Sequence, residues 1–144
     1  MFDITRANDI SILHLYGELS LMEMELIEKT LHSLRKHRHM KVLIDMAGVD
    51  HVHFEVTKRL ASEAQRMRRE KGEIKLAGTT EANRQVFQFT GADQYMDDYS
   101  SVADALLSFL SGAGNEEDHD YFRDAGKTDN RPLHLKRSFR DDMI

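Results

Sequence analysis

A short run of consecutive apolar residues, followed by an amphipathic helical pattern, constrains the fold of this chain most. Residues 42–44 are Val-Leu-Ile, a continuous apolar run that is typical of a central strand covered on both faces. After residue 54, apolar residues recur at helical spacing, at Val56, Leu60, Ala64 and Met67. We therefore predict a buried strand, a loop over residues 46–53, and a helix that Gly72 brings to an end.

Strand and helix patterns alternate along most of the chain. Ser20 and Glu23 have the spacing of a capping box, which predicts a helix beginning after Ser20. The order β-β-α-β-α-β-α-β-α predicts an α/β fold with a mixed, mostly parallel sheet and about four helices packed on it. The other predicted elements are a hairpin over residues 2–17, short strands at 74–77 and 95–96, and helices ending near residue 38, spanning about 80–91, and beginning near 101.

The pattern stops at Gly112, and the residues beyond it differ in character. Residues 112–144 contain the only proline and few large apolar side chains, and an acidic stretch at 115–120 precedes a basic stretch at 131–140. This composition is typical of an irregular, charged tail. We therefore divide the chain into a domain over residues 1–111 and a C-terminal tail over 112–144. The few apolar residues of the tail could anchor a partner or form a homodimer contact.

Composition narrows the classes of function. The 144 residues suit one domain, and the absence of cysteine excludes disulfides, thiol catalysis and cysteine zinc sites. The formal net charge of −5 argues against a dedicated nucleic-acid partner. The N-terminus lacks the pattern of a signal peptide, and no apolar run approaches the length of a membrane span. We expect a cytoplasmic protein that does not insert directly into a membrane.

Closely spaced histidines raise the question of a metal site. His-x-His pairs occur at residues 37–39 and 51–53, and the second pair could bind a metal with Asp50 or Glu55 as a third ligand. No third ligand has a diagnostic spacing, and no phosphate loop or nucleophile–base pair is recognisable in the sequence. We therefore expect no metal, no other cofactor and no enzyme activity, while metal-dependent chemistry at the second pair remains a hypothesis to test.

Several stretches, in order and at the usual spacing, resemble the STAS domain of anti-sigma-factor antagonists. They are residues 17–20 (Gly-Glu-Leu-Ser), the strand ending at Asp45, residues 75–78 (Lys-Leu-Ala-Gly), and residues 86–91 (Val-Phe-Gln-Phe-Thr-Gly) followed by Asp93. The resemblance covers about residues 2–110 and implies a STAS-type mixed sheet. It also implies that the protein acts by docking on a partner, such as a serine kinase of the anti-sigma type, and not by catalysis.

The resemblance draws attention to the start of the helix that follows the central strand. Regulatory members of the family carry Asp-x-Ser-Gly there, with the serine as phosphate acceptor, whereas residues 53–56 of this chain are His-Phe-Glu-Val. Counting from Asp45, the acceptor position falls on Glu55. A glutamate carries one negative charge where phosphoserine carries nearly two. Glu55 is therefore either a partial mimic of the phosphorylated state or an ordinary first-turn residue that contributes about 0.3–1 kcal/mol.

We expect the partner to bind the surface formed by residues 50–59 and the first helix. Thr57, two positions after the acceptor position, is an alternative site of phosphorylation. The expected function is a non-catalytic regulatory module, and the alternative is a small STAS subunit of a larger assembly, such as a stressosome-like particle or a lipid-transport ATPase complex. The candidate partner-binding residues are Asp50, His51, His53, Phe54, Glu55, Thr57, Lys58, Arg59 and Met22.

Overall fold

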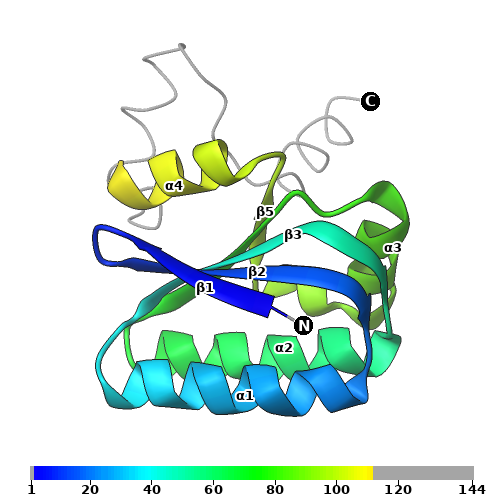
Figure 1. Ribbon diagram of the computed structural model, residues 1–144, viewed down its shortest axis with the longest axis horizontal. Helices are drawn as coiled ribbons and strands as arrows, with labels where there is room; N and C mark the ends of the chain where they lie inside the picture. Colours follow the sequence, from blue (N-terminus) through cyan, green and yellow to red (C-terminus); the bar gives the residue numbers. More distant parts are fainter. Residues whose placement is uncertain (1, 112–144) are drawn as a thin grey trace.

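The computed structural model describes residues 2–111, which form a five-stranded sheet with helices on both faces (Figure 1). The predicted tail at 112–144, the homodimer contact assigned to it and the domain boundary before it lie at or outside the limit of the described residues. The elements are β1 (Phe2–Ala7), β2 (Ile10–Leu19), α1 (Leu21–Lys36), β3 (Lys41–Val52), α2 (Phe54–Arg69), β4 (Glu73–Ala77), α3 (Glu81–Thr90), the 3₁₀ helix η1 (Ala92–Gln94), β5 (Asp97–Tyr99) and α4 (Val102–Leu110).

The sheet confirms the predicted mixed, mostly parallel arrangement. The strands follow one another in the order β1-β2-β3-β4-β5, and β1 is antiparallel to β2 while the other neighbours are parallel. Helices α1, α2 and α3 lie on one face of the sheet, and α4 lies on the other (Figure 1). The four helices and five strands of the described residues match the predicted fold class.

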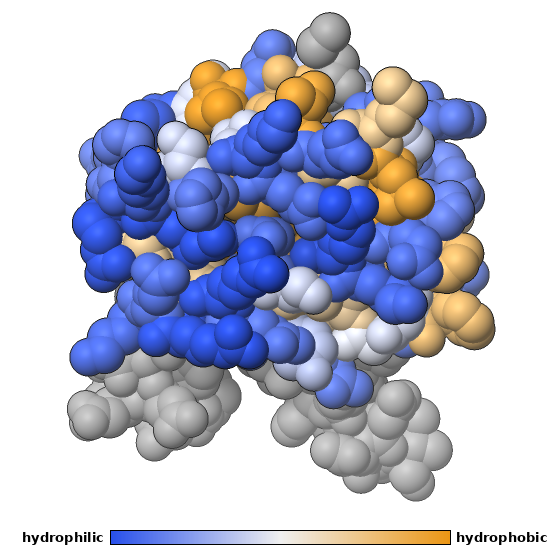
Figure 2. Space-filling model, turned by 90° about the horizontal axis from the view of Figure 1, so that it is seen from below, coloured by the Kyte–Doolittle hydropathy of each residue, from blue (hydrophilic) through white to orange (hydrophobic). Residues whose placement is uncertain are grey.

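The larger hydrophobic core lies between the sheet and the helices α1, α2 and α3. The predicted apolar stripes of α1 and α2 supply it, and residues such as Ile27 and Leu60 are fully buried there. A smaller core lies between the sheet and α4, where Tyr99 and Phe109 are its largest side chains. Seen from the side of α1 and α2, the surface is mostly hydrophilic, and hydrophobic residues gather toward its margins (Figure 2).

The prediction of a loop over residues 46–53 is wrong, because β3 continues as a strand to Val52. β2 also continues to Leu19, and the two strands stay paired through two register shifts, the second of which falls at Gly17. Gly17 has a φ of +74°, a conformation that glycine adopts at little cost. The register shifts change which face each residue occupies, so the buried residues Met46 and Val49 do not follow the alternation of a regular strand.

The last strand is also displaced from its predicted position at residues 95–96. β5 comprises Asp97–Tyr99 and pairs with β4. Aspartate is disfavoured in strands, so the sequence pattern pointed to the apolar residues just before it. The carboxylate of Asp98 is satisfied in the fold, since Thr79 Oγ1 donates to Asp98 Oδ1 at 3.3 Å and Arg84 Nε donates to Asp98 Oδ2 at 3.4 Å. These contacts with Thr79 and Arg84 therefore outweigh the low strand propensity of aspartate.

Candidate functional site

α2 begins almost directly after the end of β3, and His53 is the one residue between them. His53 has an extended backbone, with φ −72° and ψ 143°, and its Nδ1 accepts a hydrogen bond from the Glu55 N–H at 3.1 Å. The His53 N–H donates to the carbonyl of Leu19 at 3.1 Å, which holds this junction beside the end of β2. A side chain that satisfies one of the first free N–H groups explains why the helix begins at Phe54.

Glu55 lies in the first turn of α2, as the sequence predicted. Its side chain is 39% exposed, and its Oε1 accepts a hydrogen bond from Lys58 Nζ, one turn later, at 3.3 Å. The free N–H groups and the positive end of the helix dipole favour a negative charge here. The carboxylate is therefore a stable charge that solvent and a visiting protein can both reach.

A buried asparagine of α3 fixes the position of this junction. Asn83, which is 1% exposed, accepts a hydrogen bond from the Val52 N–H at 3.1 Å and donates from Nδ2 to the Val49 carbonyl at 3.1 Å. β4 pairs with β3 only as far as Ala77, so the Asn83 amide replaces the missing neighbour along the last part of β3. Sequence reasoning missed this residue, although a polar residue four positions before the buried Phe87 is an available signal.

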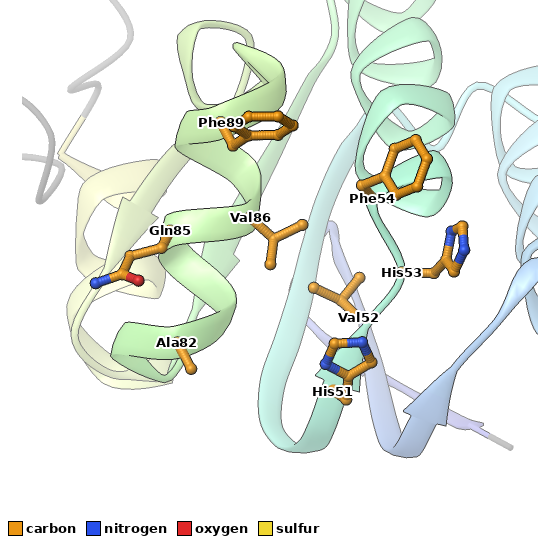
Figure 3. A pocket seen from close by; sticks show the side chains of 8 residues that line it. All are labelled: His51, Val52, His53, Phe54, Ala82, Gln85, Val86 and Phe89. Atoms are coloured by element: carbon orange, nitrogen blue, oxygen red, sulfur yellow. The ribbon is translucent and has the colours of Figure 1, made fainter.

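An open apolar groove lies between the start of α2 and the outer face of α3 (Figure 3). Its volume is about 410 Å³, and its most exposed aromatic residues are Phe54 at 46% and Phe89 at 85%. The His53 ring stacks on Phe54 with 4.7 Å between the ring centroids. The contribution of α3 was not predicted, because the sequence does not show which side of α3 is exposed next to α2. The lining residues are His51, Val52, His53, Phe54, Ala82, Gln85, Val86 and Phe89.

Most of the predicted partner-binding residues lie together on the surface around the start of α2. The first turn of α1 is close to them, because β2 pairs with β3 up to Leu19 and Val52, just before the two helices begin. Met22 of α1 is 79% exposed, and Arg59 is partly exposed. The predicted residues with exposed side chains at the start of α2 are Asp50, His51, His53, Phe54 and Lys58.

Thr57 is the exception, because its side chain is buried between α2 and α3. Its Oγ1 donates to the Phe54 carbonyl at 2.7 Å and lies 2.8 Å from Thr90 Oγ1. Neither a docking partner nor a kinase can reach this hydroxyl in the folded domain, so Thr57 does not belong to the predicted surface. The reason is its place beside the apolar stripe of α2, on the side that α3 covers.

Arg59 is engaged with the neighbouring helix. Its Nε donates to Glu28 Oε2 at 2.9 Å, and its Nη2 donates to the second oxygen of the same carboxylate. These hydrogen bonds raise the pKa of Arg59 above its ordinary range. A partner that used Arg59 would have to compete with Glu28, so the positive charge most open to a partner in this turn is Lys58.

The geometry does not assemble a metal site from the second histidine pair. Among residues 2–111, no three side chains of the histidine, aspartate or glutamate types are placed so that they could hold one ion. None of the helices in this part of the chain has the length and hydropathy to cross a bilayer.

A family model and several solved structures are similar to this chain. The model of the STAS domain matches residues 1–105. A putative anti-sigma factor antagonist from Thermotoga maritima has a similar structure, with a TM-score of 0.68 and 18% identity over 74% of this chain and 92% of that chain. The unphosphorylated form of the anti-sigma factor antagonist SpoIIAA has a TM-score of 0.65 and 18% identity, over 78% of this chain and 97% of that chain.

A chain from a structure of the stressosome, described as a signal integration and transduction hub, is also similar. Its TM-score is 0.61 at 16% identity, over 77% of this chain and 98% of that chain. No curated protein matches the chain by sequence. At these identities, the likeness of the solved structures establishes the fold.

Proposed function

This chain belongs to the STAS domain family, and from that premise we propose that it is a regulatory module of the cytoplasm that binds a protein partner and catalyses no reaction. The partner is a serine kinase of the anti-sigma type or a related signalling protein. The observation that carries the proposal is Glu55, a partly exposed carboxylate in the first turn of α2. That turn is the place where the family resemblance puts the phosphate-accepting serine.

The surroundings of Glu55 suit protein docking. Two apolar side chains in this region are exposed, with Phe54 in the same turn and Met22 in the first turn of α1. Aromatic residues that can be buried by a partner contribute most of the binding free energy in many interfaces. Asp50, His51 and Lys58 supply polar groups around them, as is usual at the rim of an interface.

The proposed role of Glu55 is to hold the module in one signalling state. The helix N-terminus stabilises the negative charge whether it comes from a phosphate or from a carboxylate. Because Glu55 has no hydroxyl group, a serine kinase cannot modify it, and the charge cannot be removed by a phosphatase. The module would then report one state to its partner at all times.

The proposal is tested by capturing partners from the native organism on the full chain. We expect Glu55→Ser to alter partner binding and to create an acceptor that a related serine kinase phosphorylates, whereas Glu55→Ala alters binding without phosphorylation. Asp104→Ser is the matched control, because Asp104 occupies the first turn of α4 on the other face of the sheet. If both Glu55 variants bind the partner as the wild type does, the fixed-state role of Glu55 is wrong.

A second candidate function is a subunit of a larger assembly, which the similarity to a stressosome chain favours. Exposed apolar residues on α1 (Leu21, Met22 and Leu26) and on α3 (Phe89) would allow contacts with more than one neighbour. Native co-purification separates the two functions. A soluble kinase supports the first, whereas a large particle, or an ATPase with a membrane partner, supports the second. Repeating the capture without residues 112–144 shows whether the tail takes part.

A further inference from the structure

Three neighbouring strands bring a hydroxyl, an imidazole and a carboxylate into line on the face of the sheet that carries α4. Thr5 lies on β1, His14 on β2 and Asp45 on β3. Thr5 Oγ1 is 2.9 Å from His14 Nε2, and His14 Nδ1 is 2.8 Å from Asp45 Oδ2. These are the distances at which a general base activates a hydroxyl nucleophile while a carboxylate orients the base.

The chemistry of Asp45 decides the direction of the hydrogen bonds. An ionised carboxylate only accepts, so His14 Nδ1 carries the hydrogen that lies between them. In the neutral imidazole, Nε2 is then an acceptor, and the Thr5 hydroxyl donates to it. Asp45 is itself held in place, because its Oδ1 accepts a hydrogen bond from the Ala47 N–H at 3.1 Å. The hydroxyl proton of Thr5 therefore points at a base with a fixed orientation.

Thr5 remains accessible in the described part of the protein. It is an exposed residue on the edge strand β1. The side chains of His14 and Asp45 are 27% and 18% exposed, so a small molecule can approach them from solvent. The core beneath α4 includes Ile12, which lies one alternation before His14 on the same strand. The three residues thus lie beyond the part of this face that α4 packs against.

The charges near Thr5 determine which class of group donor can approach its hydroxyl. Asp3, two residues before Thr5 on β1, accepts a hydrogen bond from the hydroxyl of Tyr16, and Asp45 adds a second carboxylate. Two negative charges disfavour an anionic donor such as a nucleoside triphosphate. We propose that Thr5 is a reactive acyl acceptor that takes an acyl group from an uncharged activated ester or thioester.

The transfer balances with the groups present. Thr5 Oγ1 attacks the carbonyl carbon of the ester, and the hydroxyl proton moves to His14 Nε2. The bond from Oγ1 to the carbonyl carbon forms as the bond from that carbon to the alkoxide or thiolate breaks. The leaving group departs with its electron pair and takes up a proton from the imidazolium or from water. No oxidant, reductant or metal is required.

The test uses the full chain and 4-nitrophenyl acetate, with the modified residue located by peptide mass spectrometry. Ser100 is the matched hydroxyl, because its Oγ donates to the Asp104 carboxylate at 2.9 Å and no imidazole is among its hydrogen-bond partners in the described residues. General-base catalysis typically contributes about 10²–10⁴-fold, so we expect Thr5 to be acetylated about a hundredfold faster than Ser100. His14→Gln should reduce acetylation of Thr5 to the rate of Ser100 and leave acetylation of lysines unchanged.

Asp45 acts through His14 and is a positioning residue. We expect Asp45→Asn to slow acetylation of Thr5 while the ratio between Ser100 and the lysines stays the same. The comparison of Thr5 with Ser100 in the wild type needs no variant, so it stands even if a substitution unfolds the chain. If Thr5 is acetylated no faster than Ser100, or if His14→Gln leaves its rate unchanged, the assignment is wrong and the three side chains only join the strands.

Discussion

The two ends of the paired helices α1 and α2 differ in what holds them and in what they expose. At the C-terminal end, Arg35 Nη1 lies 2.6 Å from Glu63 Oε1, and the two side chains are only 9% and 4% exposed. Arg38 and Glu70 form a second pair across the helices at 3.2 Å. At the N-terminal end, Phe54 and Met22 are exposed, and Glu55 pairs with Lys58 of its own helix.

The difference indicates that stability and recognition depend on opposite ends of the same helix pair. A buried ion pair, Arg35–Glu63, joins the helices at one end, where removal of one partner leaves a poorly compensated charge. The other end presents apolar and charged side chains that a partner can cover. Substitutions at the C-terminal end should therefore change the free energy of unfolding, and substitutions at the N-terminal end should mainly change binding.

The largest expected effect is at the C-terminal end, in Glu63→Ala. This change removes the partner that lies 2.6 Å from the buried Arg35 and leaves it only Glu70, at 3.8 Å, so we expect it to lower the free energy of unfolding by about 3–5 kcal/mol, measured by urea denaturation. Glu55→Ala, on the same helix, is the control and should cost less than about 1 kcal/mol. A loss at Glu63 no greater than the loss at Glu55 would contradict the division between the two ends.

The next largest loss of stability is expected for Asn83, the residue that holds the end of β3 in place before the exposed N-terminal end of α2. Asn83→Ala leaves the Val52 N–H and the Val49 carbonyl without their side-chain partner in a buried region, so we expect a loss of about 2–3 kcal/mol. Gln85→Ala, on the exposed side of α3, should change stability by less than about 0.5 kcal/mol. Urea denaturation of both variants gives the comparison. Equal stability of the two variants would show that β3 holds its position without Asn83.

Those parts of the fold that depend on burial at regular spacing were predictable from the sequence. The stripe that contains Val56 and Leu60 predicted α2, and the apolar run at residues 42–44 predicted the central strand. Each pattern marks a surface that becomes buried when the chain folds. The first-turn position of Glu55 followed from the same pattern, since it precedes the first buried residue of the stripe.

The parts that depend on neighbours distant in the sequence could not be predicted in this way. Phe87 and Phe89 are two residues apart on α3, yet they are 2% and 85% exposed, and the composition of the segment does not distinguish them. The burial of Thr57 depends on Thr90 of α3, and the length of β3 depends on its irregular pairing with β2. The groove beside Phe54 is a product of these tertiary contacts.

A smaller effect is expected at the junction that begins α2. His53→Ala removes the acceptor for the Glu55 N–H, so we expect the free energy of unfolding to fall by about 0.5–1 kcal/mol in thermal or urea denaturation. His53→Asn should retain most of the stability, because asparagine is a favoured residue at this position. If the alanine and asparagine variants are equally unstable, the stacking of His53 on Phe54 matters more than the hydrogen bond.

The smallest expected effect is a pH dependence at the start of α1. The hydroxyl and the backbone N–H of Ser20 both donate to Glu23 Oε1, and these hydrogen bonds hold the pKa of Glu23 below its ordinary value of 4.5. Because the folded-state pKa is the lower one, the stabilisation is present above pH 4.5 and is lost as the pH falls through the folded-state pKa. The stability difference between wild type and Ser20→Ala should therefore shrink on acidification, whereas the difference for Ser33→Ala, an exposed serine of the same helix, should not. A difference at Ser20 that stays constant with pH would mean that the exposed end of α1 gains nothing from the charge of Glu23.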